Sequence, residues 1–264
     1  MHPVLFHLGP LTIHTYGFLI ACGFLVAVAV IKRLSGRSGL DVDRVLDLTF
    51  WGLLVGFAGA RLLFVITRLS TFVADPISVF RIWEGGLVFF GGPLAVVPFV
   101  IWYSKKHKLP MWRVMDVLAP GLAIAHVIGR FGCIAAGCCY GRPTGSDWGL
   151  RFNSDLVDIA LRGVPLHPTQ LYEAASVFIL FLGLIWIHRI KKFDGQVTLT
   201  YLMGYPVIRS VIETFRGDTV RGFVIEGVLS TSQFISALVF FLALISLIVR
   251  LRSIQTSPAT GVKA

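Results

Sequence analysis

Apolar residues gather in seven long runs along the chain, separated by shorter polar segments. A helix needs about 20 predominantly apolar residues to cross the hydrocarbon core of a bilayer. The runs cover residues 15–31, 45–66, 85–102, 114–136, 171–187, 197–212 and 228–249. The pattern predicts an all-α, polytopic membrane protein with about seven transmembrane helices.

Composition supports this prediction, because 55% of the 264 residues are hydrophobic and 14% are charged. The net charge of +10 is typical of some nucleic-acid-binding proteins, but here the basic residues stand beside apolar runs and do not form one solvated patch. We therefore expect a membrane bilayer and no nucleic acid as partner. No positively charged segment precedes the first run, so we predict that this span is retained and is not a cleaved signal peptide.

Lysine and arginine mark one side of the predicted membrane. They cluster after the first, third, fifth and seventh runs, at Lys32, Arg33, Arg37, Arg44, Lys105, Lys106, Lys108, Arg113, Arg189, Lys191, Lys192, Arg250, Arg252 and Lys263. By the positive-inside rule these segments are cytoplasmic, which places the N-terminus outside and the C-terminus inside. We expect residues 1–252 to form one transmembrane domain with a small extracytoplasmic head at about 140–168, followed by a disordered cytoplasmic tail, 253–264.

The fourth run carries two polar side chains, His126 and Arg130, one helical turn apart. An arginine near the bilayer centre costs roughly 2.5–3.5 kcal/mol to insert and usually faces a protein interior or a polar cavity. Glycines at 129, 132, 137 and 141 suit close backbone approach and a broken helix. We interpret this stretch as a polar pocket near one membrane surface.

Tyr205, Arg209 and Glu213 form a second polar group, at spacings that place them on one helical stripe. Pro206 should start or bend the helix here. Two interpretations stay open. Arg209 and Glu213 can form a structural ion pair, or Arg209 and Arg130 can converge from two spans to bind a phosphate, which in a bilayer is a phospholipid head group.

The segment HPTQLYE, residues 167–173, begins the fifth span at its outer end. Pro168 and Thr169 are helix-start signals, while His167 and Glu173 are candidates for an acid, a base or a structural link. His14 and Tyr16 lie near the same predicted outer surface, where a tyrosine can also be an ordinary interfacial residue.

Two further features have a structural and a functional interpretation. Cys133, Cys138 and Cys139, with His126, offer ligand types for zinc or copper. Since adjacent cysteines fit one tetrahedron poorly, we expect no metal and predict that the thiols line a tight pocket. Gly52, Gly56 and Gly59 form a stripe for close helix packing, and Arg61 after it either pairs with an acidic residue or contacts a lipid phosphate.

These motifs together resemble the prolipoprotein diacylglyceryl transferase family. Its signature, G-R-x-G-N-F-x-N-G-E-x-x-G-R, is matched in register at Gly129, Arg130, Gly132, Gly137, Gly141 and Arg142. HPTQLYE, the HTYG that begins at His14, and the Tyr205, Arg209, Glu213 stripe match further family motifs in the same order. The chain departs from the signature at Cys133, Ala136 and Cys138, and Phe90 stands where many members have a histidine proposed as the base.

The resemblance implies transfer of the diacylglyceryl group from phosphatidylglycerol to the lipobox cysteine thiol of a prolipoprotein, giving a thioether and glycerol 1-phosphate. It also implies a bacterial cytoplasmic (inner) membrane location, a site toward the outer leaflet, and no metal or organic cofactor. The candidate catalytic residues are Arg130, Arg209, Tyr16 and His14. For the base, which the resemblance leaves open at Phe90, the candidates near the outer surface are His14, His126 and His167, then Glu213 and Tyr16, and we favour His14. Those implied to bind phosphatidylglycerol are Arg130, Arg209, Arg142, Gly141, Tyr205 and Glu213, supported by His167 and Glu173. The alternative is a small lipid or anion transporter or flippase that uses the same arginines, although we find no internal repeat of the kind such folds carry.

Overall fold

A computed structural model describes residues 4–8, 11–81, 85–154, 156–217, 222–225 and 228–256. The chain forms two compact units, one made of Met1–Val30 with Ala119–Ala264 and the other of Ile31–Leu118. The sequence shows no sign of this division, and the expectation of a single transmembrane domain stays a prediction. Each unit is described below by itself.

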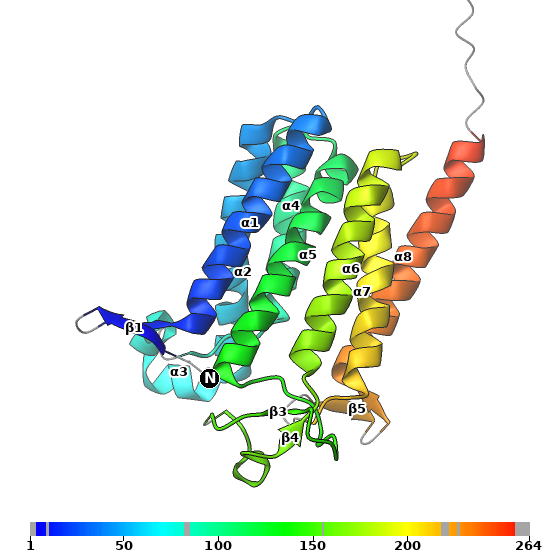
Figure 1. The fold of residues 1–264 in the computed structure, drawn as a ribbon. Coiled ribbons are helices and arrows are strands. Elements are labelled where there is room, and N and C mark those ends of the chain that lie inside the picture. The colour runs from blue at the N-terminus through cyan, green and yellow to red at the C-terminus, as the bar shows by residue number, and fades with distance from the viewer. Residues whose placement is uncertain are drawn as a thin grey trace, which may run out of the picture. The chain divides into compact units, whose positions relative to one another are not determined.

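Helices form at all seven apolar runs within the described residues (Figure 1). They are α1 (Thr15–Arg37), α2 (Val42–Thr67), α4 (Gly91–Lys106), α5 (Met111–Ala136), α6 (Thr169–Ile190), α7 (Gln196–Glu213) and α8 (Thr231–Thr256). Five of them, α1, α2, α5, α6 and α8, are long and apolar enough to cross a membrane. The structure therefore supports a mostly helical protein with five candidate spans, and the count of seven stays a prediction.

The third predicted span differs most from the structure. Helix α4 begins at Gly91 and has 16 residues, whereas the apolar run begins at position 85. Gly85 and Gly86 have φ angles of +85° and +82°, which a right-handed helix does not accommodate.

In the unit formed by Ile31–Leu118, α2 and α4 pack closely through glycines. A Cβ added to Gly59 would collide with Ala95 Cβ and would lie 2.5 Å from the Gly91 carbonyl oxygen, and one added to Gly91 would collide with the Gly59 backbone. A Cβ on Gly56 would lie 3.2 Å from Val96. The predicted packing role is thus confirmed for Gly56 and Gly59, while nothing lies within 4 Å of a Cβ on Gly52.

This unit also contains the helix α3 (Leu69–Ala74) and the 3₁₀ helix η1 (Pro76–Phe80). The Arg61 guanidinium donates hydrogen bonds of 2.6–3.3 Å to the backbone carbonyls of Ser78, Val79, Arg81, Gly85 and Gly86. These bonds tie the irregular backbone before α4 to α2. The two predicted partners of Arg61, an acidic residue or a lipid phosphate, stay predictions.

In the other unit, α5, α6 and α7 share an apolar core of buried residues. Its members are Ala119, Ala123, Val127, Ala174, Val177, Leu184, Val197 and Tyr201. Helix α8 packs against α7. Because α5, α6 and α7 meet along this core, polar side chains on their facing stripes are brought together.

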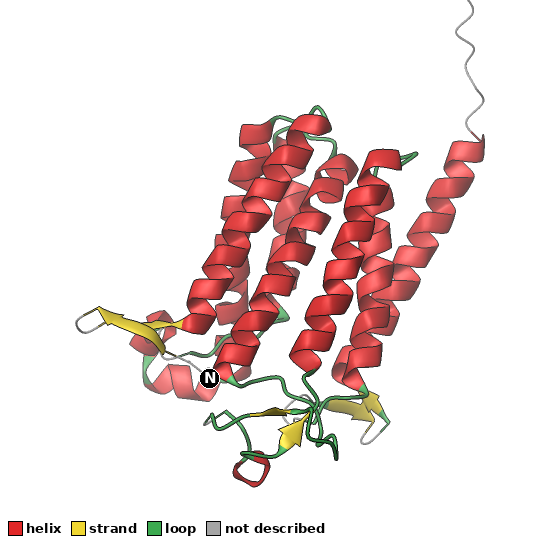
Figure 2. Ribbon diagram, in the orientation of Figure 1, coloured by secondary structure: helices red, strands yellow, loops and turns green. Residues whose placement is uncertain are grey.

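Within the described residues, three two-stranded antiparallel sheets qualify the all-α prediction (Figure 2). They pair β1 (Val4–Leu8) with β2 (Leu11–His14), β3 (Leu150–Arg151) with β4 (Pro165–Leu166), and β5 (Phe223–Ile225) with β6 (Leu229–Ser230). The predicted head segment, which also holds the 3₁₀ helix η3 (Ile159–Leu161), has a small core of its own. Tyr140, Phe152, Val157 and Leu166 form that core. Which side of a membrane this segment faces stays a prediction.

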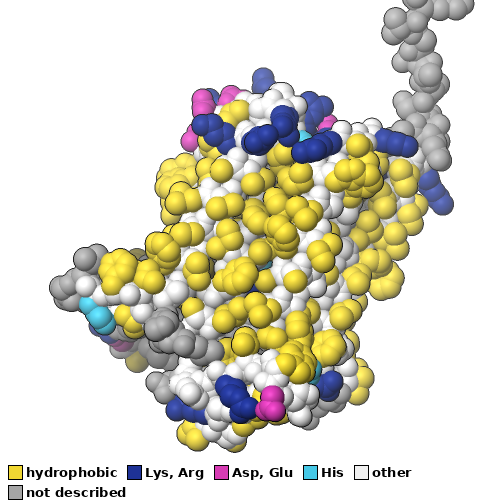
Figure 3. All heavy atoms as spheres, viewed as in Figure 1, with side chains coloured by type: hydrophobic (Ala, Val, Ile, Leu, Met, Phe, Trp, Pro, Cys, Tyr) yellow, Lys and Arg dark blue, Asp and Glu magenta, His cyan; other side chains and the backbone are white. Residues whose placement is uncertain are grey.

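Large apolar side chains cover the exposed sides of the helices, and Lys and Arg gather near helix ends (Figure 3). On α2 the exposed residues include Trp51, Phe57 and Leu62, and on α8 they include Phe241 and Leu242. Such surfaces need an apolar solvent, which identifies a multi-pass membrane protein. Helix α8 continues four residues past position 252, where the tail was predicted to begin, and residues 257–264 lie outside the described part of the chain.

Candidate functional site

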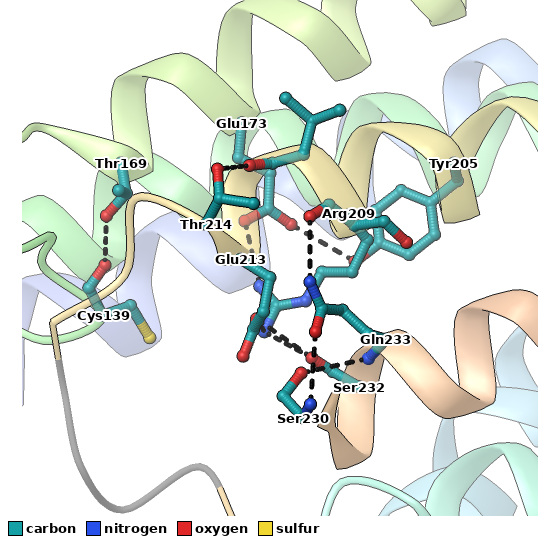
Figure 4. A network of polar contacts seen from close by, with 12 residues as sticks. Cys139, Thr169, Glu173, Tyr205, Arg209, Glu213, Thr214, Ser230, Ser232 and Gln233 are labelled. Carbon is teal, nitrogen blue, oxygen red and sulfur yellow. Dashed lines mark hydrogen bonds and ion pairs between the residues drawn. The ribbon is translucent and has the colours of Figure 1, made fainter. Parts of the chain in front are cut away.

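The centre of the polar site is Glu173, one turn into α6, whose side chain is only 2% exposed. Its Oε1 accepts hydrogen bonds from Arg130 Nη2 of α5 at 2.7 Å and from the Tyr205 hydroxyl of α7 at 3.2 Å. Its Oε2 lies 3.4 Å from Arg209 Nη1 (Figure 4). One carboxylate therefore holds two guanidiniums that arrive from different helices.

Helical spacing explains why these groups meet. His126 and Arg130 are four residues apart on α5, and Tyr205 and Arg209 are four residues apart on α7, so each pair lies on one face. Both faces belong to helices that share the core with α6. Pro206 neither starts nor ends α7, which runs without interruption from Gln196 to Glu213.

Arg209 has a second carboxylate partner and a hydroxyl partner. Its Nη2 lies 2.8 Å from Glu213 Oε2, which confirms that the two residues pair on one stripe. The same nitrogen donates to Ser232 Oγ at 3.2 Å, and Ser232 donates to Glu213 Oε2 at 3.0 Å (Figure 4). Ser232 was not among the residues predicted from the sequence, because a serine near the start of a helix is usually a helix-capping residue.

His126 occupies an ambiguous place in this network. Its Nε2 lies 3.0 Å from Arg130 Nε and 3.2 Å from Glu173 Oε1. The first contact requires a lone pair on Nε2, while a hydrogen bond to the carboxylate requires a proton there. The tautomer of the His126 ring therefore decides which of the two neighbours it binds.

The charges within this cluster balance. Arg130 and Arg209 carry two positive charges, and Glu173 and Glu213 carry two negative ones, with side-chain exposures of 14%, 12%, 2% and 3%. Buried charges are tolerated when each is paired and hydrogen-bonded. Among the described contacts, Arg130 Nη1 and Arg209 Nε have no hydrogen-bond acceptor, so each guanidinium keeps donors that a further anion can use.

Gly141, Arg142 and His167 meet beside the ends of α6 and α7, through their backbones. The Gly141 amide donates to the His167 carbonyl at 3.0 Å, the Arg142 amide to the Phe215 carbonyl at 2.9 Å, and the His167 amide to the Arg142 carbonyl at 3.0 Å. A Cβ on Gly141 would lie 2.6 Å from His167 Cβ and 2.7 Å from the Phe215 oxygen. This position requires glycine for close backbone approach, and the Arg142 side chain is exposed.

The His167 ring packs among aromatic rings. Trp148, Tyr172 and Phe215 have ring centroids 5.5–6.2 Å from it, and its Nδ1 lies 3.2 Å from the Tyr172 hydroxyl. These contacts favour the interpretation of His167 as a structural link.

The two predicted catalytic residues of the first span lie near its start. Tyr16 packs over Gly132 of α5, where an added Cβ would lie 3.0 Å from the Tyr16 ring. His14 ends β2, pairs with Val4 and is exposed. The contacts described for the polar cluster include His126 and do not include His14.

The predicted helix-start signals stand at the start of α6, where Pro168 is the N-cap residue and Thr169 the first helical residue. The Thr169 hydroxyl donates a hydrogen bond to the Cys139 carbonyl at 2.7 Å. Cys133 in the last turns of α5, and Cys138 and Cys139 in the turn that follows, have sulfurs within 4.8 Å of one another.

Comparison with known proteins matches residues 3–249 to the family model described as prolipoprotein diacylglyceryl transferase. The chain belongs to the prolipoprotein diacylglyceryl transferase family. Phosphatidylglycerol–prolipoprotein diacylglyceryl transferases that resemble it include one from Clostridium tetani, 36% identical over 89% of this chain and 92% of the relative. Others are from Geobacter sulfurreducens, 34% identical over 92% of each chain, and Oceanobacillus iheyensis, 31% identical over 96% of this chain and 89% of the relative.

In this family member, three separate sequence motifs contribute residues to the polar cluster around Glu173. The signature motif in the second half of α5 contributes Arg130, and the HPTQLYE motif contributes Glu173 itself. The polar stripe of α7 contributes Tyr205, Arg209 and Glu213. Phe90 is the N-cap residue of α4. A phenylalanine cannot accept a proton, so any base must come from another residue.

Proposed function

We propose that this chain transfers the diacylglyceryl group from phosphatidylglycerol to the lipobox cysteine thiol of a prolipoprotein. The observation that carries the proposal is the convergence of Arg130 and Arg209 on one buried carboxylate, in a chain whose relatives bear the name of this activity. In the reaction the thiol sulfur forms a bond to the terminal glyceryl carbon of the lipid. The bond between that carbon and the phosphate oxygen breaks, which releases glycerol 1-phosphate.

The phosphate of the lipid would bind to the guanidinium donors that the carboxylates leave available. Arg130 Nη1 and Arg209 Nε belong to planar forks already oriented by Glu173 and Glu213. Arginine binds phosphate through two parallel N–H groups. As the bond to carbon breaks, negative charge grows on the phosphate, and donors fixed in advance stabilise this charge without having to reorganise.

His126 is the better-placed candidate for the base. A free thiol is only a few per cent ionised at neutral pH, so proton removal promotes the attack. Nε2 of His126 lies within hydrogen-bond distance of both Arg130 Nε and Glu173 Oε1. A proton taken from the thiol would sit on this nitrogen, stabilised by the Glu173 carboxylate, before it passes to the departing phosphate. His14, which was favoured as the base from the sequence, is the residue to replace for comparison.

The membrane placement is part of the proposal. We infer that the seven long helices cross a bacterial inner membrane, with the N-terminus outside and the C-terminus in the cytoplasm. The support is the clustering of every lysine in segments after odd-numbered spans. In this orientation the start of α6, with Glu173, lies toward the outer leaflet, where a secreted prolipoprotein would present its cysteine.

The experiment that tests the proposal combines the purified chain, phosphatidylglycerol vesicles and a synthetic lipobox peptide. The expected product is a peptide whose mass has increased by one diacylglyceryl group, and a peptide with serine in place of cysteine should stay unmodified. Movement of lipid or anion without any change in peptide mass would overturn the proposal and favour a transporter. His126→Gln should lower the transfer rate by about 10²–10⁴-fold if this residue is the base, whereas a comparable loss only in His14→Gln would assign the role to His14.

A further inference from the structure

Three of the four cysteines converge at the end of α5 and in the turn that follows it. The sulfurs of Cys133, Cys138 and Cys139 lie within 4.8 Å of one another, and all three are free thiols. Cys133 is buried in the last turns of α5, and the other two are half-buried in the turn that follows. The transfer reaction proposed above uses none of them, because the attacking thiol belongs to the substrate.

The backbone that carries these thiols is held in an uncommon conformation. Gly137 and Cys139 have φ angles of +75° and +60°, and the left-handed region is costly for a residue with a Cβ. Buried side chains of α6 stabilise this turn. Thr169 Oγ1 donates to the Cys139 carbonyl and Gln170 Nε2 to the Cys138 carbonyl, both at 2.7 Å.

The sulfur separations fit one metal ion. Thiolate sulfur binds a metal such as zinc at about 2.3 Å, so three sulfurs placed around one ion in a plane are separated by about 4.0 Å, which is √3 times that length. Since the three sulfurs already lie within 4.8 Å of one another, they need to move only slightly closer together to reach this geometry. Among the described residues, the group of converging ligands contains these three sulfurs and no histidine or carboxylate.

Ligand number and type distinguish between metals. Zinc usually takes four ligands in a tetrahedron, whereas soft thiolates also select Cu(I), and a monovalent ion suits a site with three. Adjacent cysteines fill a tetrahedron around zinc poorly, but three-coordinate Cu(I) does not require a tetrahedron.

We propose that Cys133, Cys138 and Cys139 form a three-thiolate binding site for one Cu(I) ion. The test titrates the full-length, reduced protein in detergent with Cu(I), buffered by a chromogenic chelator. One Cu(I) per chain should bind, with ultraviolet absorption from the copper–thiolate bonds. Cys139→Ser should weaken binding by more than about 100-fold, because loss of a direct ligand exceeds the 10–100-fold effect of losing a supporting residue.

Cys22, in α1, provides the matched control. Cys22→Ser should bind one Cu(I) as the unaltered chain does. The proposal is overturned if the unaltered chain and the Cys133→Ser/Cys138→Ser/Cys139→Ser variant bind Cu(I) with the same affinity. It is also overturned if the unaltered chain binds one Zn(II) and no Cu(I).

Thiol alkylation of the unaltered chain gives an answer that depends on no variant. With one equivalent of Cu(I), mass spectrometry should find the three converging cysteines protected from alkylation, while Cys22 keeps the reactivity it has without copper. Equal protection of all four cysteines, or of none, would refute the three-thiolate site.

Discussion

Glu173→Gln is the substitution that should disturb the site most. The change keeps the shape of the side chain but removes the negative charge that faces Arg130 at 2.7 Å and Arg209 at 3.4 Å. With Glu173 only 2% exposed, water cannot replace the lost carboxylate. Removal of one partner from a buried ion pair lowers the free energy of unfolding by about 3–5 kcal/mol.

Thermal unfolding of the purified protein in detergent measures this effect. For a chain of this size each 1 kcal/mol shifts Tm by roughly 2–4 °C, so Tm should fall by about 6–20 °C. The control is Asp147→Asn, the same chemical change in a fully exposed ion pair with Arg151, which should leave Tm unchanged.

A second substitution tests whether an unpaired buried charge causes the lower Tm. Glu173→Gln combined with Arg130→Met leaves the neutral Arg209–Glu213 pair, so the double variant should recover part of the lost Tm. If Glu173→Gln unfolds at the same temperature as the Asp147→Asn control, or if the double variant is less stable than Glu173→Gln, the charge argument is wrong.

Three further substitutions test other parts of the account. Gly141→Ala should lower the free energy of unfolding by about 1–3 kcal/mol because its Cβ overlaps neighbouring backbone. Gly183→Ala, in open space on α6, should have no such effect in the same unfolding assay; equal behaviour of the two would contradict the packing described. Ser232→Ala should lower the free energy of unfolding by about 1.5 kcal/mol, because it removes the hydrogen bond between the serine hydroxyl and the charged Arg209. A variant as stable as the unaltered chain would show that the hydroxyl is dispensable. Joint replacement of Cys138 and Cys139 by alanine should leave most peptide transfer intact, and abolished transfer in a folded variant would instead give these thiols a part in the reaction.

The helices could be predicted from the sequence because their length follows from bilayer thickness. Each apolar run contains a helix, and α5 ends at the predicted residue, Ala136. The start of α4 could not be predicted this way, since hydropathy does not show that Gly85 and Gly86 take positive φ angles. The hairpin of β1 and β2 was missed for a similar reason: strand pairing depends on a turn that composition alone does not reveal.

The candidate site was predictable within each helix but not between helices. Spacing placed His126 with Arg130, and Arg209 with Glu213, because residues four apart share a helical face. Nothing in that periodicity identifies which side chain of another helix completes the group, so the central role of Glu173 emerged only from the packing of α5, α6 and α7. The cysteine cluster depends on a left-handed turn at Cys139, which spacing also does not show.

The central claim is that Arg130 and Arg209 hold one phosphate during transfer, and release of glycerol 1-phosphate tests it most directly. The measurement compares kcat/KM for the unaltered chain, Arg130→Lys, Arg209→Lys and the double variant, with folding of each checked by Tm. Each single change keeps the charge but loses the planar fork, so kcat/KM should fall by about 10²–10³-fold. The double variant should lose far less than the product of the two single losses, because groups that act on one phosphate do not act independently. Near-normal release by either single variant, or strictly multiplicative losses, would contradict the shared phosphate site.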